Sequence, residues 1–133
     1  MVAIMRFHEK FYGDVLTIAL DGKLIGEPET TQLHNILSSA ITAGKCKIVL
    51  DLQKVEWMGS IGFGIITGGL MYARSAGGDL RLTGLNKKVA KLLTITKLNC
   101  VFQTFESIHK AISSYAGESE ISLIDNNDSV LIS

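Results

Sequence analysis

Long hydrophobic runs are absent from this 133-residue sequence, although 47% of its residues are apolar. The longest apolar stretch, residues 61–73, is shorter than the roughly 20 residues of a membrane span, and it contains four glycines. The N-terminus also lacks the basic region, apolar block and cleavage site of a signal peptide. We therefore expect a cytoplasmic protein that does not insert into a membrane.

Proline and cysteine are scarce, with one proline and two cysteines. A chain with this apolar content is expected to be ordered over most of its length. Its size suits one domain with a single core. Cys46 and Cys100 lie far apart and have no CxxC partner. They could form a disulfide, but two buried free thiols are favoured in a cytosolic protein.

The chain also has no net charge at pH 7, because 13 basic residues balance 13 acidic residues. A partner held mainly by bulk charge, such as nucleic acid or an anionic membrane, is therefore not expected. A local charged patch remains compatible with this balance.

No motif for catalysis, metal binding or nucleotide binding is recognisable. His8, His34 and His109 fall on separate predicted elements without metal-ligand spacing, so we assign each a surface or local structural role. The glycines of residues 62–69 match neither GxGxxG nor a P-loop. Ser60 lies in Gly-Ser-Ile-Gly rather than the GxSxG of hydrolases, and no acid–histidine pair is placed to activate it. We predict no enzymatic activity, metal or cofactor.

Strand and helix patterns alternate along the chain, which predicts an α/β domain with a largely parallel sheet. An edge strand at 2–8, a turn at 11–14 and a strand at 15–20 ended by Asp21-Gly22 should form an opening hairpin. Further strands are predicted at 46–52, 80–83 and 99–102. The predicted helices run from 28 to 43, from 61 to 76, from 86 to 95 and from a Thr104 cap to about 112.

The strand at 46–52 is apolar on both faces, which is typical of a central strand covered on both sides. The helix after it carries four glycines, each of which costs about 1 kcal/mol relative to alanine. Close packing against the sheet and close approach of a partner both explain these glycines, and both stay open.

Ser60 stands in the turn before this helix. Its hydroxyl is a natural N-cap, able to accept a hydrogen bond from a backbone N–H two or three positions on. The same place suits a phosphate, because free N–H groups and the helix dipole stabilise an anion. A structural cap and a phosphorylation site therefore both remain open.

Residues 116–133 break the pattern. Acidic stretches at 117–120 and 125–128 alternate with short apolar pieces at 121–124 and 130–132. We expect one domain over residues 1–115, followed at 116–133 by an acidic tail or a small hairpin.

Several segments together resemble the STAS domain of bacterial anti-sigma factor antagonists. They are Leu20–Leu24, Ile48–Leu52, Val55, Met58–Gly64 and Gly78–Leu82. The resemblance, over roughly residues 4–115, implies a small, mixed, mostly parallel sheet with helices packed mainly on one side. It also implies a non-enzymatic protein that binds an anti-sigma factor, usually a serine kinase, and so releases a sigma factor. In this family the kinase switches binding off by phosphorylating a serine, and a phosphatase reverses this.

The resemblance places the partner-binding surface around residues 57–70, in a protein expected to be a monomer or weak dimer. The residues that it assigns to partner binding are Asp21, Gly22, Trp57, Met58, Gly59, Ser60, Ile61, Gly62, Phe63 and Gly64. The alternative is a STAS regulatory subunit that handles a ligand or lipid beside a transporter or another complex.

The phosphorylation motif of this family is altered here. The common pattern is Met-Asp-Ser-Ser-Gly-Leu-Gly; on residues 58–64 its aspartate falls on Gly59, its first serine on Ser60 and its phosphoacceptor on Ile61. Ser60 is the remaining phosphorylation candidate, although a shift of one residue turns a helical side chain by about 100°. An exposed Ile61 would form an apolar contact surface with Phe63, whereas an inward Ile61 would join the core.

Overall fold

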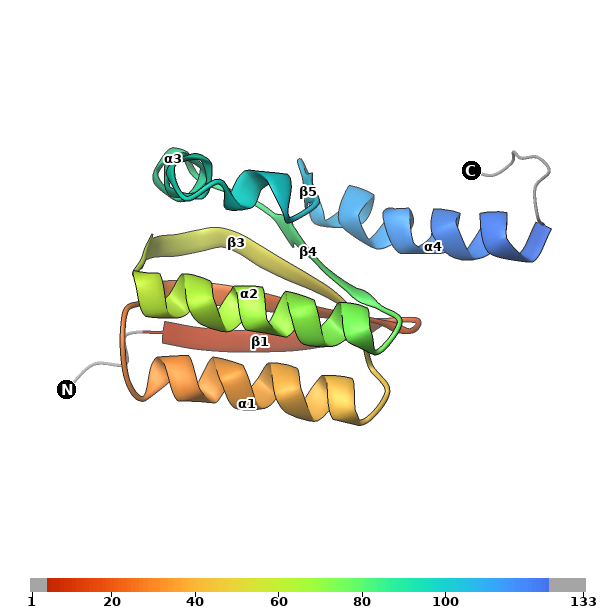
Figure 1. Ribbon diagram of the computed structural model, residues 1–133, viewed down its shortest axis with the longest axis horizontal. Helices are drawn as coiled ribbons and strands as arrows, with labels where there is room; N and C mark the ends of the chain where they lie inside the picture. Colours follow the sequence, from red (N-terminus) through yellow and green to blue (C-terminus); the bar gives the residue numbers. More distant parts are fainter. Residues whose placement is uncertain (1–4, 125–133) are drawn as a thin grey trace.

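The computed structural model describes residues 5–124, with side chains described for residues 5–116. Its sheet has five strands in the order β1-β2-β3-β4-β5 (Figure 1). The hairpin of β1 (Met5–Tyr12) and β2 (Val15–Leu24) is antiparallel. The strands β3 (Lys47–Met58), β4 (Asp79–Thr83) and β5 (Thr104–Phe105) continue the sheet in parallel from β2. This mixed, mostly parallel sheet confirms the predicted fold class.

Three helices share one core with the sheet: α1 (Glu29–Thr42), α2 (Ser60–Ser75) and α3 (Lys87–Ile95). Alternate residues of the central strands, such as Ile18, Leu50 and Leu82, are buried against them. The predicted first helix packs on the sheet through Leu33 and Leu37, which are buried in the same cluster. Each such side chain contributes roughly 1.5–3 kcal/mol on burial.

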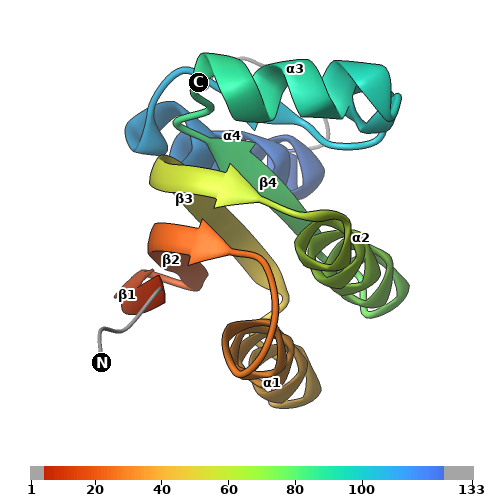
Figure 2. The same ribbon diagram turned by 90° about the vertical axis from the view of Figure 1, so that its left-hand side faces the viewer.

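The fourth helix, α4 (Ile108–Ile124), covers part of the opposite face of the sheet (Figure 2). Val15 and Val49 are buried there against Ala111 and Tyr115. The Tyr115 hydroxyl accepts a hydrogen bond from the Ile48 N–H (3.2 Å) and lies 2.8 Å from the Ile48 carbonyl oxygen. The prediction that the third strand is covered on both faces is therefore confirmed.

A charge network lies beside this tyrosine, with Asp79 and Arg81 buried and Arg74 exposed. Asp79 accepts hydrogen bonds from the Nε atoms of Arg74 (2.9 Å) and Arg81 (3.0 Å). The guanidinium of Arg81 stacks over the Tyr115 ring, 4.0 Å from its centroid. The pairing offsets part of the cost of burying Arg81, and loss of Asp79 alone would leave that charge buried and uncompensated.

The opening strands are longer than predicted. The edge strand runs on to Tyr12, and Gly13 makes the turn with a φ of 64°. The second strand does not end at Asp21-Gly22 but continues to Leu24. Its pairing with β3 shifts register on both sides of Asp21-Gly22, and the φ of 127° at Gly22 suits glycine alone.

The prediction for residues 99–102 is wrong. A 3₁₀ turn, η1 (Leu98–Cys100), occupies this position, and the strand β5 forms later. Thr104 is a residue of β5 and does not cap the last helix. That helix begins at Ile108, and the Ser107 hydroxyl accepts a hydrogen bond from the Lys110 N–H (3.2 Å).

Two further expectations need correction. Residues 121–124 belong to α4, so the hairpin predicted within 116–133 is wrong; the rest of that segment lies outside the described residues. The acidic tail and the domain boundary at 115 stay predictions. Cys46 and Cys100 are free thiols as expected, but the first is only partly buried and the second is exposed.

Candidate partner-binding surface

The turn between β3 and α2 is tied to the end of β2. The Gly59 N–H donates a hydrogen bond to the Leu24 carbonyl oxygen (2.9 Å), and Gly59 accepts one from the Phe63 N–H (3.1 Å). Gly59, in extended conformation, is the N-cap residue of α2. The first turn of α2 is therefore fixed at the same edge of the sheet as the loop from β2 to α1.

Ser60 does not cap this helix, contrary to the structural alternative. The cap position falls on Gly59, and Ser60 is the first helical residue. Its side chain is exposed, and within the described residues no hydrogen bond to its hydroxyl is found. A hydroxyl at this position faces solvent and is accessible to modification.

The predicted partner-binding residues divide by exposure. Trp57 is 40% exposed and Ile61 58% exposed, and Ser60 and Gly64 also face solvent. The partly buried members are Asp21 and Gly59, and the buried members are Gly22, Met58, Gly62 and Phe63. The contact role of the exposed members stays a prediction, whereas the buried ones anchor the turn.

The open question about Ile61 is resolved. Its side chain points outward, but Phe63 is only 8% exposed and packs in the core. The expected apolar surface of Ile61 with Phe63 is therefore wrong. Two residues along a helix turn the side chain by about 200°, so only one of the two can face solvent here.

The glycines of α2 serve two purposes. A Cβ at Gly62 would stand 2.9 Å from Leu24, and one at Gly69 would stand 2.8 Å from Leu37. At Gly64 and Gly68 an added Cβ would meet nothing within 4 Å. Close packing explains the first pair, while the second pair leaves the outer face of the helix open.

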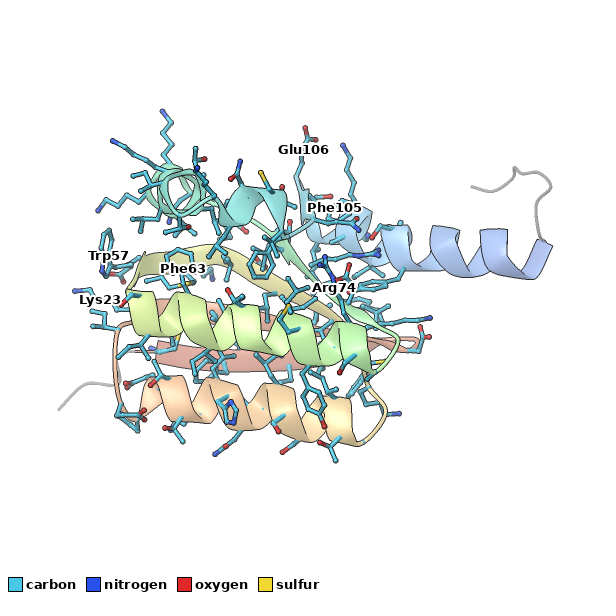
Figure 3. The ribbon with its side chains drawn as sticks, in the orientation of Figure 1. Lys23, Trp57, Phe63, Arg74, Phe105 and Glu106 are labelled. Carbon is cyan, nitrogen blue, oxygen red and sulfur yellow. The ribbon has the colours of Figure 1, made fainter. Side chains whose placement is uncertain are left out.

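Two residues that the sequence did not single out complete this end of the molecule. Lys23 is the β2 partner of Trp57 and is exposed beside it (Figure 3). Ile25 is 49% exposed, and its Cα would lie 3.8 Å from a Cβ at Gly59. We call Ile25, Trp57 and Ile61 the apolar end patch. The carboxyl ends of parallel strands lie at the same edge of a sheet. The parallel sheet predicted from the sequence therefore could have placed Lys23 and Ile25 at the same end of the molecule as Trp57.

A largely apolar groove of about 310 Å³, with His34 among its lining residues, runs between α1 and α2. Leu37 and Ile41 line it from α1, and Gly64, Gly68 and Tyr72 line it from α2. The Tyr72 hydroxyl forms a hydrogen bond with the Thr42 hydroxyl (2.8 Å), which joins the two helices. The groove exists because the two open glycines leave this part of the helix pair unfilled.

Groups suited to chemistry do not converge here. Within residues 5–116, no cluster of His, Cys, Asp and Glu could hold a metal ion. All three histidines are exposed, which confirms their predicted surface position. In the loop between β2 and α1, the pKa of Glu27 is lowered because Thr31 and Thr30 donate hydrogen bonds to its carboxylate. Across the described part of the chain, no helix is both long and apolar enough to traverse a bilayer.

The family model described as the STAS domain matches residues 7–111, and the chain belongs to this family. It is 29% identical over 82 residues to a Thermotoga neapolitana protein named as a candidate anti-sigma factor antagonist, covering 62% of this chain and 73% of that relative. A crystal structure of such a candidate from Thermotoga maritima has a TM-score of 0.72 at 26% identity, covering 81% of this chain and 92% of the other.

The fold extends to a more distant neighbour. Unphosphorylated SpoIIAA, an anti-sigma factor antagonist, has a TM-score of 0.70 at 19% identity, covering 84% of this chain and 99% of that one. At this identity the likeness supports the fold alone. The resemblance stated from the sequence is thus confirmed for family and architecture.

Proposed function

We propose that this protein is an anti-sigma factor antagonist that binds an anti-sigma factor through the apolar end patch and the first turn of α2. The observation that carries the proposal is that Trp57 (40% exposed) and Ile61 (58% exposed) both face solvent, one on each side of a turn held by core contacts. Clustered exposed apolar side chains are typical of protein interaction sites. Family membership and the names of the relatives support the same function.

The end patch is suited to binding because its support is rigid. Met58 and Phe63 are buried on either side of the turn, and Gly59 is hydrogen-bonded to Leu24. A surface that is already ordered loses little conformational entropy when a partner binds. We place the protein in the cytoplasm as a monomer or weak dimer, acting without catalysis, and we expect its partner to resemble a serine kinase.

Phosphorylation control is the point at which this protein departs from its family. Position 61 holds isoleucine, which has no hydroxyl to accept a phosphoryl group. We infer that binding at the end patch is not switched off at this position. Ser60 is the one hydroxyl left in the turn, and a phosphatase has a role only if Ser60 is modified.

The proposal is tested by calorimetric titration with the purified anti-sigma factors of the same organism. Ile61→Glu should raise the Kd by at least about 30-fold, because it removes a central apolar contact. Met71→Glu is the matched control, since Met71 is 62% exposed on the same helix but ten residues further on. Equal losses in the two variants, or no binding by wild type, would contradict the proposal.

The loss of phosphorylation control is tested by restoring a serine at position 61, the position of the family's phosphoacceptor. Ile61→Ser, incubated with a kinase-like partner and ATP, should gain about 80 Da in intact mass and then release the partner. Wild type should gain no mass under the same conditions. A phosphoryl group mapped to Ser60 in wild type would show instead that the acceptor has moved by one residue.

The groove favours a second candidate function, a STAS module that holds an apolar ligand or lipid beside a transporter or other complex. Its volume of about 310 Å³ lies at the lower end of small-molecule sites. Native mass spectrometry of protein from its own cells should then detect a bound molecule, and Gly68→Leu should abolish it by filling the groove. Ligand-free wild-type protein would remove this candidate.

A further inference from the structure

Although the net charge is zero, basic and acidic residues are distributed unequally along the sequence. All 13 Lys and Arg residues lie within residues 1–116, whereas four of the 13 acidic residues lie within 117–133. The first 116 residues therefore carry a formal charge of +4. Between Asp79 and Glu106 there are five basic residues and no acidic residue. Arg81 is buried and paired with Asp79, so the other four, Lys87, Lys88, Lys91 and Lys97, gather the positive charge in and directly after α3.

The lysines of α3 are placed where they disfavour the helix. Lys87 and Lys88 occupy its first turn, which holds no acidic residue, although the N-terminus of a helix already carries about half a positive charge. Lys91 follows one turn later, and all three side chains are exposed. Within the described residues none of the three has an ion-pair partner. Stability alone would favour Asp or Glu in this turn.

These lysines adjoin the apolar end patch. The Asn86 side chain, which caps α3, donates a hydrogen bond to the Val55 carbonyl oxygen (2.6 Å) and accepts one from the Val89 N–H (2.8 Å). Val55 is two residues before Trp57, whose β2 partner is Lys23. Figure 2 faces this end, where α3 lies above the starts of α1 and α2.

We propose that Lys23, Lys87, Lys88 and Lys91, the basic rim, receive an acidic segment of the protein partner while the apolar end patch fills its apolar pocket. The inference rests on the proposed function and names the chemistry of the partner. Lys–carboxylate pairs at the edge of an interface accelerate association and set its orientation. The partner's carboxylates would also supply the negative charge that the first turn of α3 lacks.

A protein partner fits this surface better than a nucleic acid does. Lysine pairs with carboxylates and with phosphates alike, so the apolar end patch beside the rim makes the distinction. Exposed isoleucines at 25 and 61 have no counterpart on a phosphate backbone.

The test compares two triple variants of the full chain with equal changes of charge. K87E/K88E/K91E alters the rim, and K10E/K45E/K110E alters exposed lysines on β1, the α1–β3 loop and α4. Association rates with the purified anti-sigma factor are measured at salt concentrations from about 0.05 to 0.5 M. The rim variant should associate at least about tenfold more slowly at low salt and converge with wild type at high salt. The control should stay within about twofold of wild type.

Folding does not confound this comparison. Glutamates in the first turn of α3 complement the helix dipole, so the rim variant should melt no lower than wild type. Slower association with an unchanged or raised melting temperature supports the rim. An equal reduction of the association rate in the two variants would overturn the inference, because the total charge of the protein rather than the basic rim would then control association.

A second measurement separates failure of the inference from failure of the proposed function. If no anti-sigma factor binds, a deca-glutamate peptide is titrated into the wild-type chain and followed by amide NMR. Shifts at Lys23, at Trp57 and along α3 support an acidic ligand. Shifts elsewhere, no shifts, or tighter binding to duplex DNA or to phosphatidylserine vesicles would overturn it.

Discussion

Gly62 packs so closely on Leu24 that a Cβ at position 62 would stand 2.9 Å from the Leu24 carbonyl oxygen and from its side-chain carbons. The carbonyl oxygen also accepts the hydrogen bond from Gly59. This contact brings the end of β2 against the start of α2. It therefore decides where Ile25 lies relative to Ile61.

Alanine at position 62 should destabilise the fold, because backbone at Leu24 cannot yield as a flexible side-chain end can. We expect the Gly62→Ala variant to lose about 1–3 kcal/mol of unfolding free energy in urea titrations. Gly64→Ala is the matched control and should gain up to about 1 kcal/mol, since its Cβ enters open space on the same helix. Equal stability of the two variants would contradict the close packing.

Removal of the Tyr115 hydroxyl should weaken the attachment of α4. Tyr115→Phe leaves backbone groups of Ile48 and Asp79 without a buried partner, so we expect a loss of about 1–3 kcal/mol. Tyr72→Phe removes an exposed hydrogen bond to Thr42 and should change stability by less than about 1 kcal/mol. Chemical denaturation of both variants makes the comparison. A smaller loss at position 115 than at 72 would show that α4 does not depend on this hydroxyl.

Charge reversal in the first turn of α3 should stabilise the protein. Lys88→Glu places an anion at the positive end of the helix dipole and should raise the unfolding free energy by about 0.3–1 kcal/mol at low salt. Lys91→Glu, beyond the first turn, should have a smaller effect because the dipole interaction falls off within one turn. Thermal melts at low and high salt measure both. A loss of stability in Lys88→Glu would contradict the unfavourable placement of this lysine.

The ion pair of Asp14 with Lys47 should give a small dependence on pH. The Lys47 ammonium, 2.8 Å away, lowers the pKa of the Asp14 carboxyl by hydrogen bonding and by its charge. Because the pKa of Asp14 is lower in the folded state, the ion pair adds to the free energy of unfolding above the unfolded pKa of about 4. This contribution is lost as the pH falls through the folded pKa. Because the pair is exposed, Asp14→Asn should cost no more than about 1 kcal/mol at pH 7. In urea titrations, the difference in unfolding free energy between Asp14→Asn and wild type should vanish once the pH is below the folded pKa of Asp14.

Much of this architecture could be predicted from local pattern. The strand predicted at 15–20 necessarily puts Leu16 and Ile18 on one face and Val15 and Thr17 on the other, and the structure buries all four. The apolar run at 46–52 identified the central strand, and the motif at 58–64 located the turn. These features depend on neighbours in sequence, so periodicity and turn chemistry suffice to find them.

Short or irregular elements could not be predicted in this way. The strand at Thr104–Phe105 exists because it pairs with Leu82 and Thr83, and nothing local distinguishes it from a loop. The continuation of β2 past Asp21-Gly22 likewise depends on pairing with a shifted register of β3. Both outcomes are decided by a partner strand far away in the sequence.

The sequence by itself determined the family, the order of the main elements and the loss of the hydroxyl at position 61. Only the tertiary structure decided that Ile61 faces solvent while Phe63 is buried, and that Gly59 rather than Ser60 caps the helix. It also brought Lys23 beside Trp57 and Ile25 beside Gly59. The physical reason is that the rotation of α2 about its axis is set by contacts such as Gly62 with Leu24, which join segments distant in the chain.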